Sequence, residues 1–164
     1  MEKVAYLLWS PPTRSPDQFR ERLLASVPTQ FGRLGARRVK VCVTDSAVDA
    51  GAGLHLGAHR PHALVTWWTD SSFDDRGCVD ILASVTDRIA GYLVSESEPL
   101  RYAKRSRPGT RCDGFTAVGC IEPADGLSLE EFRARWFGPH RATAIETQHT
   151  FSYVRNEVVR PLTD

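Results

Sequence analysis

Hydrophobic residues recur with two different periods along the first hundred residues of this chain. Apolar runs that end at turn residues, or that alternate with polar residues, are typical of strands. Apolar residues spaced three and four positions apart are typical of amphipathic helices. We therefore expect, in order, strand 3–9, helix 16–27, strand 37–45, strand 63–70, helix 78–93 and a strand over 92–105 that overlaps the end of that helix.

The first of these helices has both a start signal and a stop signal. Ser15 is a natural N-cap, and Gln18 three residues later completes a capping box. Pro28 has no amide hydrogen to donate, so it should end or kink the helix. We expect the helix to stop near Val27.

The order strand–helix–strand–strand–helix–strand defines an α+β unit of the ferredoxin-like type, βαββαβ. Helices of such a unit cover one face of an antiparallel sheet, and the other face needs a partner. We expect this first unit to span residues 1–106.

Residues 107–164 repeat the beginning of that pattern, with a strand over 114–122, a helical stretch from Ser128 and a strand over 149–157. At one constant offset, Ser128 corresponds to Ser15 and Phe132 corresponds to Phe19, so we expect the helices to occupy equivalent core positions. The second unit is incomplete, with βαβ only. A half sheet has an open edge, so we expect either a fragment of a longer protein or completion by another subunit, as in a homodimer.

Composition and charge remove several classes of function. The chain has 164 residues, a formal net charge of +1 and no long apolar run, so we expect neither nucleic acid nor a membrane as partner. The sequence opens without a signal-peptide pattern, and its four cysteines form no Cys-x-x-Cys pair, which favours a cytoplasmic location. Cys42 and Cys120 lie in apolar runs and are expected to be buried.

The stretch 127–162 resembles the EthD family of the dimeric α/β-barrel superfamily. The residues that carry the resemblance are Leu127, Ser128, Glu130, Glu131, Phe132, Trp136, Gly138, Pro139, Tyr153, Val154 and Asn156. This chain departs from the family pattern at one point. The family histidine often stands just before Gly-Pro, where this chain has Phe137, and the imidazole here follows at His140.

The resemblance implies two ferredoxin-like units packed sheet to sheet into a dimeric-type α/β barrel, with a pocket between each sheet and its helices. It also implies a cofactor-independent enzyme, of oxidoreductase or dehydratase type, that acts on a small apolar or aromatic molecule. A binding or stress-response protein that holds such a molecule without turnover is the alternative. We expect no bound cofactor, and a haem-dependent oxygenase stays open as a weaker alternative.

The candidate catalytic residues follow the glycine–proline pair. Gly138 can end one helix and Pro139 can begin another, which places His140 and Arg141 in the first turn of the second helix. The positive end of that helix favours a neutral imidazole, which can accept a proton. A helix break that serves packing alone is the structural alternative. The candidate substrate contacts are Phe132, Trp136, Tyr153 and Asn156, of which the last two alternate in direction along one strand.

Three histidines, His55, His59 and His62, lie close together in a loop rich in glycine and alanine. Their spacing could gather zinc ligands, but Gly57 and Pro61 argue against a helix that would orient them. A solvated loop is the expectation, and no metal site is predicted.

Overall fold

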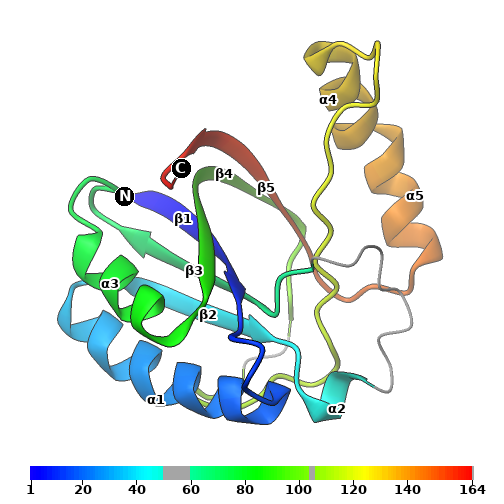
Figure 1. The fold of residues 1–164 in the computed structure, drawn as a ribbon. Coiled ribbons are helices and arrows are strands. Elements are labelled where there is room, and N and C mark those ends of the chain that lie inside the picture. The colour runs from blue at the N-terminus through cyan, green and yellow to red at the C-terminus, as the bar shows by residue number, and fades with distance from the viewer. Residues whose placement is uncertain (50–59, 104–105, 164) are drawn as a thin grey trace. The chain divides into compact units, whose positions relative to one another are not determined.

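The computed structural model describes residues 1–49, 60–103 and 106–163 (Figure 1). Within them the chain is α+β, with a five-stranded antiparallel sheet in the order β2-β3-β1-β4-β5. The elements are β1 (Glu2–Trp9), α1 (Pro16–Arg33), β2 (Arg37–Val43), α2 (Ser46–Asp49), β3 (Ala63–Thr69), α3 (Arg76–Val85), β4 (Arg88–Leu100), α4 (Leu129–Phe137), α5 (Pro139–Thr147) and β5 (Tyr153–Pro161).

The first four strands have the predicted split βαβ arrangement. β1 lies between β3 and β4 and pairs antiparallel with both, so Tyr6 faces Val65 on one side and Gly91 on the other. β2 pairs with the outer edge of β3. The predicted α+β class is therefore confirmed, and the topology is compatible with a ferredoxin-like fold.

Helices α1 and α3 lie on the same side of this sheet (Figure 1). α1 contributes a stripe of residues spaced four apart, and the strands contribute alternate positions, as each period requires. Together they form one buried cluster. Its members are Val4, Tyr6, Leu8, Phe19, Leu23, Val27, Phe31, Ala63, Val65, Trp67, Cys78, Leu82 and Val85.

Pro28 does not end the first helix, so the predicted end near Val27 was wrong. α1 continues as one α-helix to Arg33, with Pro28 exposed inside it. Phe31, in the turn after the proline, is fully buried and meets Trp67 edge to face at 4.9 Å. Burying a phenylalanine gains about 1.5–3 kcal/mol, which is comparable with the cost of about 3 kcal/mol for an interior proline.

The helix predicted over 78–93 corresponds to α3 and is shorter than predicted. It ends at Val85, and β4 begins at Arg88. Ile89 fits the helical spacing of the preceding apolar residues, yet it belongs to the strand and pairs with Leu8. The amide of Asp87 also donates to the carbonyl of Trp9 at 2.9 Å. Pairing with β1, far away in sequence, decides this boundary.

Residues 114–122 do not form the predicted strand; they have no regular secondary structure. Phe115, Val118 and Ile121 are exposed, and so is Cys120, which we had expected to be buried. Within the described ranges no strand pairs with this segment. A strand needs a neighbour to accept its backbone hydrogen bonds, so alternation alone did not produce one.

The chain divides into two compact units, one of Met1–Ser95 with Glu157–Asp164 and one of Glu96–Asn156. The predicted repeat of the helix start is present, because Ser15 with Gln18 and Ser128 with Glu131 both form complete capping boxes. The expected equivalence of Phe19 and Phe132 as core residues is absent. Phe19 is fully buried, whereas no residue of α4, which carries Phe132, is buried.

Candidate functional site

The predicted break between two helices is confirmed. α4 ends at Phe137, the amide of its C-cap Gly138 donates to the carbonyl of Ala134 at 3.1 Å, and Pro139 opens α5. A β-carbon at Gly138 would stand 2.8 Å from the backbone oxygen of Ala134. A residue with a β-carbon would clash with that oxygen, so this backbone requires glycine at the break.

His140 and Arg141 lie in the first turn of α5, as predicted, and both are exposed. Among the residues that the structure describes, no side chain caps this helix start. An exposed imidazole at this position is accessible to a bound molecule and is of the residue type that most often accepts a proton in catalysis.

Three aromatic rings form a continuous row along the end of α4. The rings of Phe132 and Trp136 are 5.6 Å apart, and those of Trp136 and Phe137 are stacked at 5.3 Å. All three side chains are half-buried. They are large enough to contact a flat apolar molecule, so the two predicted residues Phe132 and Trp136 remain candidates and Phe137 joins them.

Arg155 of β5 is the residue that the sequence analysis missed. Only 8% of its surface is exposed. Its Nε donates to the hydroxyl of Ser97 at 3.1 Å, and its Nη1 donates to the carbonyl of Trp136 at 3.3 Å. Its guanidinium lies 4.4 Å from the centre of the Phe137 ring. Its position, a charged residue in the middle of a half-buried strand, was the feature of the sequence that could have identified it as a candidate.

These contacts bring β5 and the end of α4 together. Tyr153 lies two positions from Arg155, so both side chains leave the strand on the same face. Asn156 leaves on the opposite face. Of the two predicted polar candidates on this strand, only Tyr153 shares the face that carries Arg155 and meets the aromatic row.

Of the three loop histidines, His55 and His59 lie outside the described residues. The third, His62, accepts a hydrogen bond on Nδ1 from the amide of Ser10 at 3.0 Å. Burial, and secondarily Arg60, lower the pKa of His62. The part of the chain that the structure describes contains no group of three or more possible metal ligands, and His62 instead ties its loop to the end of β1.

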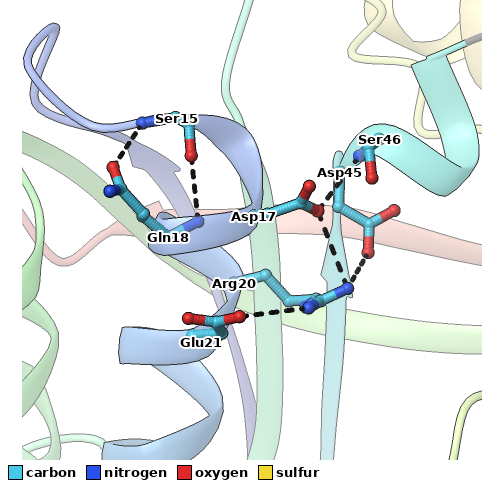
Figure 2. A network of polar contacts seen from close by, with 7 residues as sticks. All are labelled: Ser15, Asp17, Gln18, Arg20, Glu21, Asp45 and Ser46. Carbon is cyan, nitrogen blue, oxygen red and sulfur yellow. Dashed lines mark hydrogen bonds and ion pairs between the residues drawn. The ribbon is translucent and has the colours of Figure 1, made fainter.

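A second polar cluster links α1 to the start of α2 (Figure 2). The guanidinium of Arg20 lies 3.1 Å from the fully buried carboxylate of Asp45, and 3.7 Å and 3.6 Å from Asp17 and Glu21. Asp17 also accepts from the amide of Ser46 at 3.3 Å. The charges point at one another, so we assign this cluster to the stability of the fold.

The third polar cluster is inside the core of the first unit. Indole Nε1 of Trp67 donates to Oδ1 of Asp75 at 3.0 Å, while Oδ2 of Asp75 is buried with no hydrogen-bond partner among the described residues. Burial raises the pKa of Asp75 to about 6, and burial together with Asp75 raises the pKa of the Cys78 thiol to about 12. Burial also raises the pKa of Tyr6 above its usual value.

No protein-family model matches this chain, and no curated protein matches it. The resemblance to the EthD family therefore depends on the motif residues alone. None of the helices in the described ranges is both long and apolar enough to cross a membrane.

Proposed function

We propose that this chain is an EthD-like, cofactor-independent enzyme, of oxidoreductase or dehydratase type, that acts on a small apolar or aromatic molecule. The observation that carries the proposal is the junction of α4 and α5. There an exposed imidazole follows a glycine that the backbone requires, and a row of three aromatic rings precedes it. A base beside an aromatic surface is suited to taking a proton from a bound aromatic molecule.

In this proposal each residue has a distinct role. Phe132, Trp136 and Phe137 contact the flat part of the substrate, and His140 accepts its proton. Arg141, next to His140, stabilises the negative charge that remains on the substrate oxygen. Tyr153 supplies a hydroxyl on the adjoining strand.

A ligand screen tests the proposal directly. Hydroxylated aromatic compounds that bind the folded state should raise the melting temperature, because a ligand stabilises the state to which it binds. Compounds that do so are then incubated with the protein, and their conversion is followed by mass spectrometry. Binding without conversion would identify a binding protein instead. A Soret band in the absorption spectrum of the purified protein would identify a haem protein.

We also propose that two copies associate, with the sheets packed into a dimeric-type α/β barrel. β5 is an edge strand of the sheet, and its Val158 and Val159 are 53% and 60% exposed. An exposed apolar edge favours association with another chain. Light scattering at about tens of micromolar, a usual range for such contacts, should give the mass of a dimer. A stable monomer at that concentration contradicts this assembly.

A further inference from the structure

Arg155 is a buried cation whose described surroundings supply no anion. Within the described ranges Arg155 forms no ion pair, and its two hydrogen bonds go to neutral groups, the hydroxyl of Ser97 and the carbonyl of Trp136. Arginine is almost never buried unless it is paired, because a charge loses its hydration on burial. The rings of Phe137 and Trp136 offset part of that loss through cation–π contact.

The two hydrogen bonds of Arg155 hold the guanidinium in place and engage only two of its N–H groups. Ser97 takes the hydrogen on Nε, and the carbonyl of Trp136 takes one hydrogen on Nη1. A guanidinium has five N–H bonds in a planar fork, so one on Nη1 and two on Nη2 remain. A fork that is fixed in this way loses little entropy when it binds the two oxygens of a carboxylate.

We propose that Arg155 binds the oxygen anion of an aromatic ligand, a carboxylate or a phenolate, while the ring of that ligand stacks on Trp136 or Phe137. This inference rests on the proposed function, because it assigns the substrate class of the same junction of α4 and α5. It makes Arg155 the residue that selects anionic over neutral aromatic molecules. His140 then acts on the other end of a ligand that is already anchored.

A purely structural role for Arg155 is the competing explanation. The carbonyl of Trp136 is in the last turn of α4, where cations favourably meet the negative end of a helix. That role requires one N–H bond and no particular ligand. The two roles differ in one measurable respect, because only ligand binding predicts a preference for anionic aromatic molecules.

The experiment compares benzoate with benzyl alcohol, which has a similar shape and no charge, by calorimetric titration of the full chain. We expect benzoate to bind at least about tenfold more tightly. Arg155→Gln should abolish this preference and leave benzyl alcohol binding unchanged. Arg155→Lys, which retains the charge without the planar fork, should retain only part of it.

Arg135→Gln is the matched control, because it removes one positive charge from an exposed position on α4. If Arg135→Gln lowers the preference as much as Arg155→Gln does, the general positive field is responsible and the inference is wrong. If Arg155→Gln fails to fold, Ser97→Ala tests the same inference, because it removes the acceptor that holds Nε of Arg155. Releasing Nε should lower benzoate affinity about threefold or more, an effect expected for one lost hydrogen bond, and an unchanged affinity overturns the inference.

The results also separate this inference from the proposed function. Equal binding of both probes, unaffected by Arg155→Gln, overturns the anion site and leaves binding to the aromatic row as the explanation. If neither probe binds at concentrations up to about 10 mM, well above ordinary substrate affinities, both proposals are wrong.

Discussion

Trp67 and Asp75 are joined by a buried hydrogen bond of 3.0 Å that ties β3 to the start of α3. Asp75 is the N-cap residue of α3, yet its carboxyl does not cap the helix. It turns into the core, where 5% of the residue is exposed, and burial raises its pKa to about 6. The hydrogen bonds from Trp67 and Cys78 lower the pKa, but burial has the larger effect.

This carboxyl should make the stability of the protein depend on pH. The pKa of Asp75 is higher in the folded state than in the unfolded chain. As pH rises from about 4 to about 6, the unfolded chain therefore loses this proton while the folded state still holds it. The folded state is thereby destabilised by up to about 3 kcal/mol. Asp75→Asn removes the titration while its amide oxygen can still accept from Trp67. We therefore expect the free energy of unfolding of the variant, measured by urea titration, not to fall over this pH range. An identical pH profile in both proteins would rule the assignment out.

Gly91 should tolerate no larger residue. A β-carbon there would stand 2.2 Å from the ring of Tyr6, which is itself stacked on Trp67 at 5.0 Å. Because that ring cannot move away, Gly91→Ala should lower the free energy of unfolding by about 2–3 kcal/mol, as overpacked cores do. Gly32→Ala is the control, since no described atom beyond its own stretch of helix lies within 4 Å of its β-carbon, and it should gain about 0.5–1 kcal/mol in helix α1. Equal melting temperatures for the two variants would contradict the prediction.

Pro28 is an unfavourable residue that the fold tolerates, so its replacement should stabilise the protein. Pro28→Ala restores an amide hydrogen inside α1 and removes a ring that crowds the preceding turn. We expect a gain of about 2 kcal/mol, since the helix gains about 3 kcal/mol and the greater freedom of the unfolded chain offsets about 1 kcal/mol of it. Pro16→Ala, at the first position of the same helix, should give no gain. The check is a pair of chemical denaturation curves, and a loss of stability in Pro28→Ala would refute this account.

The proposed base is tested by His140→Ala. Removing a general base should reduce turnover of an identified substrate by about 100- to 10,000-fold. Because the side chain is exposed, the free energy of unfolding should change by less than about 1 kcal/mol. His149→Asn is the control, since it removes another exposed imidazole and asparagine tolerates its positive φ of 48°. Full activity in His140→Ala would exclude the catalytic role, and unfolding would identify a structural one.

Features that depend on neighbours in sequence could be predicted from the sequence. Ser15 and Gln18 form the expected capping box, and Ser128, which corresponds to Ser15 in sequence, forms the same box with Glu131 three positions later. The break at Gly138 and Pro139 is equally local, because it follows from the backbone preferences of those two residues. The placement of His140 in the first turn of α5 follows from that break.

Features that depend on distant partners were decided only by the tertiary structure. Burial of Phe31 against Trp67 extends α1 past Pro28, and pairing with Leu8 places Ile89 in a strand. Residues 114–122 have the alternation of a strand but no strand beside them in the described part of the chain. Arg155 could be assigned to a strand face from sequence, but its bond to the carbonyl of Trp136 required the fold. Local preferences are worth about 1 kcal/mol per residue, and the burial and pairing of residues far apart in sequence outweigh them.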